Sequence, residues 1–93
     1  MEKELVRTQF VIMKILKDRG AINYMRSITL SEIAEKEGRN KVNTLYKHIR
    51  GLESNGLVKQ GAKNERANAY YLSDEGLELL KKYENVEERT DGE

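Results

Sequence analysis

Two short helical patterns, with a turn of a few residues between them, lie in the middle of the chain and constrain its fold most. The run Thr29-Leu30-Ser31-Glu32 has the capping-box pattern, in which the Thr29 and Glu32 side chains each accept a hydrogen bond from the other's backbone N–H. A helix is expected to begin there and to end at Gly38, and Asn40 can cap a second helix directly after the turn. This spacing predicts a helix-turn-helix.

The second helix of this pair, near residues 40–55, is predicted to have one buried and one exposed face. Its apolar residues are spaced by three, four and three positions, and they are Val42, Leu45, Ile49 and Leu52. The opposite face has no acid before Glu53 and carries Lys41, Asn43, Thr44, Lys47, His48 and Arg50. Because Asn, Arg and Lys donors match the edges of adenine and guanine, this face suits the major groove of double-stranded DNA. A solvated face that is basic by chance is the alternative.

Two short strand patterns follow this helix, over residues 57–60 and 69–72, with a polar loop between them. They predict a β-hairpin, or wing, directly after the basic helix. The hairpin tip holds side chains that can reach a phosphate backbone or a minor groove, namely Lys63, Asn64 and Arg66. Tyr70 and Tyr71 are neighbours on the second strand, so one is expected to enter the core and the other to face outward.

Charge is distributed unevenly, although the net charge of the 93 residues is only +1. Residues 39–66 contain seven basic and two acidic residues, whereas the stretch from Leu72 to the end contains three basic and eight acidic residues. A basic segment of this kind attracts phosphates and an acidic one repels them. We therefore expect residues 39–66 to face nucleic acid and the C-terminal stretch to avoid it.

The first helix, over about residues 3–18, has more apolar residues than one buried stripe requires. This excess favours a homodimer, with an interface that we predict from Leu5, Phe10, Ile12, Leu16 and, on a last helix capped by Ser73, Leu80. The alternative is a single chain that wraps both sides of the first helix. Residues 1–84 are expected to form one domain that includes this dimerisation helix, and residues 85–93 an acidic flexible tail.

Several segments resemble the PadR- and MarR-type winged helix-turn-helix proteins, over about residues 29–83. They are Thr44-Leu45-Tyr46, Leu52-Glu53, Gly56-Leu57-Val58 and Tyr70-Tyr71-Leu72-Ser73-Asp74-Glu75-Gly76. The resemblance implies a mainly α fold with a small β-hairpin, and a repressor-like homodimer that reads a palindrome in double-stranded DNA. It implies DNA contacts from Lys41, Asn43, Thr44, Tyr46 and Lys47, with a phosphate contact from Arg50 and wing contacts from Lys63 and Arg66. Arg39 and Asn64 join this predicted DNA-binding set.

Two other functions remain open alternatives. The small size also resembles the centromere-binding partition proteins of archaeal plasmids, which spread along DNA and recruit a second protein. A winged helix that binds proteins instead of DNA is an alternative of another class.

The residue inventory argues against other classes of function. With one histidine, no cysteine and no glycine-rich phosphate loop, the sequence predicts neither an enzyme nor a metal or cofactor site. The longest apolar run, Phe10–Met13, predicts no membrane association, so we expect a cytoplasmic protein.

Overall fold

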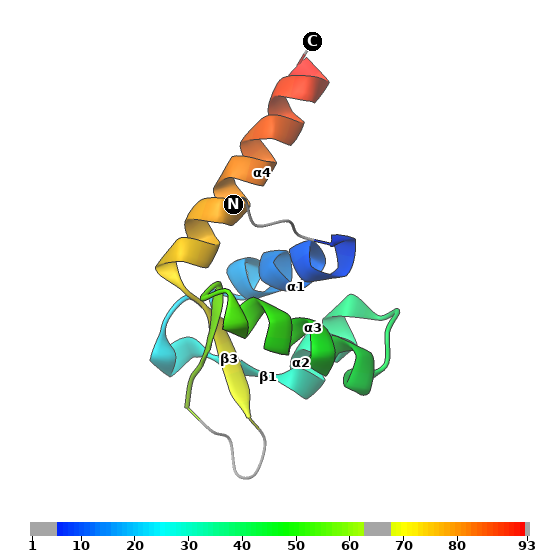
Figure 1. Ribbon diagram of the computed structural model, residues 1–93, viewed down its shortest axis with the longest axis vertical. Helices are drawn as coiled ribbons and strands as arrows, with labels where there is room; N and C mark the ends of the chain where they lie inside the picture. The colour runs from blue at the N-terminus through cyan, green and yellow to red at the C-terminus, as the bar shows by residue number, and fades with distance from the viewer. Residues whose placement is uncertain (1–5, 63–67, 93) are drawn as a thin grey trace.

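A computed structural model of the protein describes residues 6–62 and 68–92, with residues 85–92 described for their backbone alone. The described residues form four α-helices, one short 3₁₀ helix and three strands, arranged as Figure 1 shows. In order they are α1 (Arg7–Asp18), η1 (Tyr24–Arg26), β1 (Ile28–Thr29), α2 (Leu30–Glu37), α3 (Val42–Ser54), β2 (Val58–Gln60), β3 (Ala69–Leu72) and α4 (Asp74–Gly92). The predicted fold class, mainly α with a small β-hairpin, is confirmed.

The boundaries of α2 follow from local hydrogen bonds that the sequence predicted. Thr29 Oγ1 accepts a hydrogen bond from the Glu32 backbone N–H at 3.2 Å, and Glu32 Oε1 accepts one from the Thr29 N–H at 3.3 Å. At the other end Gly38 has a φ of 73°, in the left-handed region that a residue without a Cβ adopts most readily. The capping box and the glycine stop are both confirmed.

The sheet is antiparallel, with β3 in the centre and β1 and β2 at its edges. Val58 pairs with Leu72 and Gln60 with Tyr70, as the predicted hairpin requires. The sequence did not reveal β1, whose Ile28 pairs with Tyr70. A strand of two residues is too short to show an alternating pattern.

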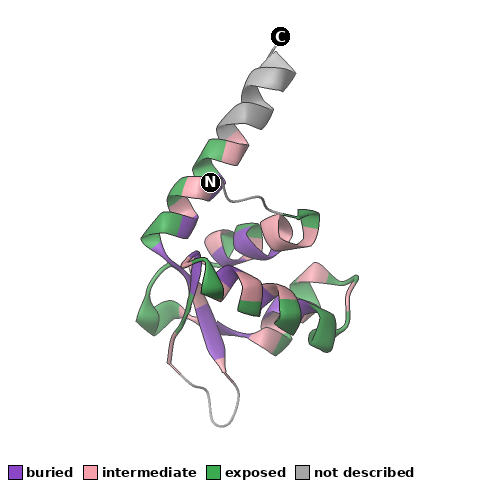
Figure 2. Ribbon diagram, in the orientation of Figure 1, coloured by how far each residue is buried: buried purple, intermediate pink, exposed green. Residues whose placement is uncertain are grey.

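The core lies between the helices and the sheet, where Figure 2 shows the buried residues of α1, α3 and β3 facing one another. Its fully buried side chains come from every main element and include Ile12, Met13, Leu16, Ile33, Leu45, Ile49, Leu52, Tyr70, Leu72 and Leu80. Tyr70 enters the core, as predicted for one of the two tyrosines, but Tyr71 is half-buried and packs against the core instead of facing outward.

The predicted dimer interface needs correction at three of its residues. Ile12, Leu16 and Leu80 are each 0% exposed within the single chain, so they offer no surface to a second copy. The reason is that α1 is a central element that α2, α3, α4 and β3 all contact, which covers more than one side of it. Phe10 is half-buried and meets Tyr83 of α4 edge to face, with ring centroids 6.0 Å apart, and Leu5 lies outside the described residues.

Helix α4 packs on α1 and β3 and then projects beyond the body of the molecule (Figure 1). Lys17 Nζ of α1 lies 2.6 Å from Glu84 Oε1 of α4, and this ion pair lowers the pKa of the Glu84 carboxyl. The acidic tail that we expected from residue 85 instead continues α4 to Gly92. No proline or glycine interrupts residues 77–91, so nothing in the backbone ends the helix earlier. No described helix is long and apolar enough to cross a membrane.

Gly76, in the first turn of α4, marks a close approach between this helix and the chain after α3. A Cβ at this position would overlap the Leu57 carbonyl oxygen and would lie 2.8 Å from Leu72 Cδ1. We expect Gly76→Ala to lower the free energy of unfolding by about 1–3 kcal/mol, because a backbone carbonyl cannot move aside cheaply. Denaturant unfolding at neutral pH measures the change.

The matched control for this substitution is Gly51→Ala inside α3. Its Cβ would meet only the flexible end of Gln9, at 3.1 Å from Nε2. Alanine normally stabilises a helix interior by about 0.5–1 kcal/mol relative to glycine, so this variant should unfold at an equal or higher denaturant concentration than the parent. Equal effects of the two substitutions would contradict the packing argument.

Candidate nucleic-acid interface

Helix α3 turns its apolar side chains into the core and its basic side chains outward. Leu45, Ile49 and Leu52 are each 0% exposed, which fixes the rotation of the helix about its axis. The residues that are exposed as a result include Lys41, Asn43, Thr44, Tyr46, Lys47 and Arg50, and His48 is half-buried. Five of the six side chains that were predicted to share an exposed face are exposed together, whereas the sixth, His48, is half-buried.

Val42 departs from the prediction, because its side chain is 43% exposed instead of buried. It is the first residue of α3, where the helix extends past the core. At 100° per residue it also lies at the margin of the stripe that Leu45, Ile49 and Leu52 define. The three-four-three spacing identified the correct face but included one residue too many.

The turn between α2 and α3 is held by Glu37, a residue that the sequence analysis did not single out. Its carboxylate accepts hydrogen bonds from the backbone N–H groups of Arg39 at 2.8 Å and Asn40 at 2.7 Å, and from Asn40 Nδ2 at 2.9 Å. The backbone hydrogen bond from Asn40 is the main cause that lowers the pKa of Glu37. The carboxylate therefore sets the path by which the chain enters α3.

Asn40 was predicted to cap α3, and this prediction is wrong. Lys41 occupies the N-cap position, and its side chain makes no capping hydrogen bond. Because Asn40 donates to Glu37, its amide belongs to the turn instead of the helix end. The first-turn N–H groups of α3 thus keep the partial positive charge of a helix N-terminus beside exposed Arg39 and Lys41.

Tyr46 and Arg50 form a local pair on the exposed side of α3. Arg50 Nη1 donates to the Tyr46 hydroxyl at 3.3 Å, and the guanidinium carbon lies 5.9 Å from the centre of the tyrosine ring. An arginine held by a hydrogen bond and a ring loses less side-chain freedom when it binds a phosphate. The pair therefore restricts the directions in which Arg50 can present its charge.

Two polar atoms are buried behind this pair without a hydrogen bond of acceptable geometry among the described residues, Glu53 Oε1 and the Tyr70 hydroxyl. Burial raises the pKa of Tyr70, the nearby Asn68 amide opposes this rise, and the charge of Glu53 adds to it. Glu53, the single acid of α3, thus acts on Tyr70 of β3, and it also lines a shallow surface hollow with Arg50.

The base of the hairpin is anchored to η1. Ser27 Oγ donates to the Tyr24 carbonyl at 3.0 Å and to the Ala62 carbonyl at 3.4 Å. Gly61 lies so close to Ser27 that a Cβ there would overlap its side chain. These contacts fix where the hairpin leaves the body. Three predicted tip residues, Lys63, Asn64 and Arg66, lie outside the described residues.

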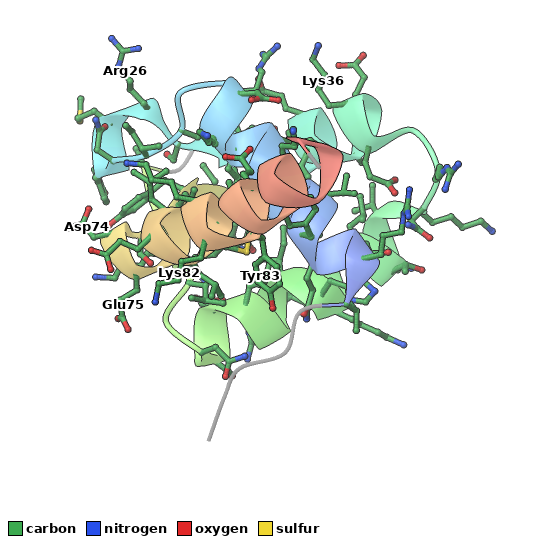
Figure 3. All side chains as sticks on the ribbon, turned by 90° about the horizontal axis from the view of Figure 1, so that it is seen from above. Arg26, Lys36, Asp74, Glu75, Lys82 and Tyr83 are labelled. Carbon is green, nitrogen blue, oxygen red and sulfur yellow. The ribbon has the colours of Figure 1, made fainter. Side chains whose placement is uncertain are left out.

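The acidic helix α4 lies apart from this surface. In Figure 1 it leaves the body on the side opposite to the end where β2 and β3 lead into the hairpin loop. Figure 3 looks along α4 and shows Asp74 and Glu75 pointing outward from its first turn. The sequence-level division between a basic middle and an acidic end therefore becomes a separation in space.

These elements define a winged helix-turn-helix fold, in which α2 and α3 form the helix pair and β2 and β3 the wing. Comparison with solved structures finds the same fold. MepR, a transcription regulator of a Staphylococcus aureus multidrug efflux pump, superposes with a TM-score of 0.82 at 17% sequence identity over 96% of this chain and 62% of that one. TubR from Bacillus megaterium pBM400 superposes with a TM-score of 0.75 at 19% identity over 84% of both chains.

ZitR of Lactococcus lactis, a zinc-responsive MarR family member, gives a TM-score of 0.73 at 21% identity. The chain spans about three fifths of the lengths of MepR and ZitR. No protein-family model matches the chain, and no curated protein matches it in sequence. At these identities the structural similarity establishes the fold.

The hydrogen bonds of Glu37 lead to a prediction about pH. Since its pKa is lowered in the folded state, the carboxylate stabilises the fold above its ordinary pKa, and this contribution is lost as the pH falls through the lowered value. Glu37→Ala should reduce the free energy of unfolding by about 1 kcal/mol at pH 7, and the deficit should shrink toward pH 3. Urea unfolding across this range measures it, with Glu35→Ala, exposed on the same helix, as control. A deficit that does not change with pH would contradict the role of the charge.

Proposed function

We propose that the protein is a site-specific, double-stranded DNA-binding regulator of transcription that acts as a repressor-like homodimer on a palindromic site. The observation that carries this proposal is the exposed face of α3, which holds Lys41, Asn43, Lys47 and Arg50 and no acidic side chain. A helix rotated in this way presents base-reading and phosphate-binding donors along one side. A surface helix without a binding role would carry both acidic and basic side chains on its exposed face.

Three features next to α3 support the same function. The N-cap residue Lys41 makes no side-chain hydrogen bond to the first turn of α3, whose N–H groups can donate to a phosphate. Arg39 and Arg50 add exposed charges at its start and middle, with Arg50 held by Tyr46. The hairpin base is anchored to η1, and the sequence of its loop supplies Lys63, Asn64 and Arg66, side chains that can contact a phosphate backbone or a minor groove.

The structural neighbours support DNA binding independently of charge. A MepR–DNA complex superposes on this chain with a TM-score of 0.77 at 18% identity, over 94% of the chain. We infer that the fold shared with MepR is used here in the same manner, with α3 as the recognition helix. Binding without catalysis also agrees with the single histidine and the lack of cysteine in the sequence.

The proposed dimer needs a surface other than the buried residues of α1. Val6, at the start of α1, is 51% exposed, and α4 projects beyond the body in Figure 1. A helical extension of a few turns is marginal in water by itself, so contact with a second copy would stabilise it. We propose that the start of α1, with Leu5 and Phe10, and the projecting part of α4 form the interface.

Plasmid partition is a second candidate, because TubR from Bacillus megaterium pBM400 shares the winged-helix fold with this chain. A partition protein would coat DNA next to its site and recruit a second protein. Footprints that lengthen with protein concentration would favour this role, and footprints confined to one palindrome would favour a regulator.

The proposal is tested by charge reversal on α3 after a target has been selected from random double-stranded DNA. We expect Lys47→Glu to weaken binding to the selected DNA by roughly tenfold or more, because it removes a groove contact and adds repulsion. Lys81→Glu, on the exposed side of α4, changes the net charge equally and should leave the Kd within about twofold. Fluorescence anisotropy at several salt concentrations measures both.

Other outcomes of this test point to other functions. If no DNA is retained even at low salt, the DNA-binding proposal is wrong, and the winged helix that binds a protein becomes the working hypothesis. Equal losses for both lysines would mean that only net charge matters and that α3 is not the recognition helix.

The dimer proposal predicts the behaviour of a charge placed at the start of α1. Val6→Glu should produce a monomer, because the carboxylate would be buried without a partner in the interface. The side chain is exposed in the single chain, so the monomer itself should stay folded. Light scattering after size-exclusion chromatography measures the mass, with Met25→Glu, at an 82% exposed apolar residue of η1, as control. A dimer that persists in Val6→Glu would place the interface elsewhere.

A further inference from the structure

The exposed face of α3 contains one apolar side chain that the proposed function leaves unexplained, Val42, beside the ring of Tyr46. Val42 is 43% exposed and Tyr46 is 39% exposed. They are four positions apart and therefore lie next to each other along one side of the helix. The other exposed residues of this face are polar or basic, so this apolar pair interrupts a surface that is otherwise suited to water and phosphate.

A hollow of about 200 Å³ lies beside this pair, where the start of α2, the first two turns of α3 and the start of β3 meet. Its lining consists of Leu30, Ser31, Val42, Tyr46, Asn68 and Tyr70. None of these side chains carries a charge at neutral pH. A phosphate would find no cation among them, so the hollow does not suit the DNA backbone.

The surroundings of the hollow limit what can occupy it. The neighbouring Lys41, Lys47 and Arg50 are exposed cations, so they attract an anionic partner. The hollow itself is mostly apolar, so the group that enters it must be apolar. In the major groove, the apolar group that base edges present is the 5-methyl group of thymine. A thymine in the major groove therefore fits both parts of the surface. Its DNA backbone is anionic, which suits the exposed cations, and its 5-methyl group is apolar, which suits the hollow.

We propose that this hollow receives the 5-methyl group of a thymine, and that Val42 and Tyr46 thereby make the protein select thymine at one position of each half-site. This inference rests on the proposed function, because it requires α3 to lie in the major groove. It assigns base selection to an apolar contact, in addition to the hydrogen bonds expected from Asn43 and Lys47. It also gives the exposure of Val42 a function.

The size of the effect follows from the surface that one methyl group removes from water. Burial of one such group corresponds to about a fourfold change in affinity, and to about fifteenfold when both half-sites of a dimer lose it. Deoxyuridine differs from thymidine only by this methyl group, and it keeps the same hydrogen-bonding edge. Replacement of thymine by uracil therefore isolates the apolar contact.

The experiment uses the full chain and the DNA selected for the proposed function, with each symmetry-related pair of thymines replaced in turn by deoxyuridine. One pair should weaken binding by about fifteenfold, and the others should leave the Kd within about twofold. Val42→Ala should bind the thymine DNA more weakly and should lose most of the sensitivity to uracil at that pair. Thermal melting of the free variant checks that this exposed substitution leaves the fold intact.

Ile22→Ala is the matched control, because Ile22 is an apolar residue with the same 43% exposure as Val42 and does not line the hollow. It should keep the full sensitivity to uracil. The inference is overturned if no thymine pair responds, if the selected half-site contains no thymine, or if Val42→Ala responds to uracil as the parent does. A Val42→Ala variant that weakens binding to both DNAs equally would place another DNA group in the hollow and would also overturn it. In all these cases the protein still binds DNA, whereas absence of any DNA binding refutes the proposed function itself.

Discussion

The burial of one face of α3 determines most of what this protein presents to its surroundings. Leu45, Ile49 and Leu52 pack against α1, α2 and the sheet with no exposed surface. A rotation of α3 about its axis would bring these side chains into water and basic side chains into the core, and both changes cost free energy. The hydrophobic core therefore also fixes the composition of the exposed face.

The ends of α3 are positioned by polar contacts that lie outside the helix. Glu37 gathers the N–H groups of the preceding turn, and its charge makes those hydrogen bonds stronger than neutral ones. Ser27 and Gly61 bring the hairpin base against η1. The helix pair and the base of the wing are thus held by separate local contacts and share one hydrophobic core. This gives the proposed DNA surface a defined geometry.

Much of this architecture could be predicted from the residues because its signals are local. The Thr29–Glu32 capping box, the left-handed Gly38 and the hairpin pairing depend on residues close in sequence. Predictions failed where distant parts of the chain decide the outcome. Whether an apolar residue of α1 faces the core or a partner depends on how α4 and β3 cover it, and periodicity carries no information about that covering.

The sequence by itself determined the helix pair α2 and α3, the hairpin of β2 and β3, the basic character of residues 39–66 and the acid-free face of α3. These follow from propensity, spacing and charge, which act over a few residues. Only the tertiary structure decided that Ile12, Leu16 and Leu80 belong to the core of one chain, that Val42 is exposed, and that a hollow forms between α2, α3 and β3. The physical reason is that burial is a property of all the elements that surround a side chain, and these elements come together only when the chain folds.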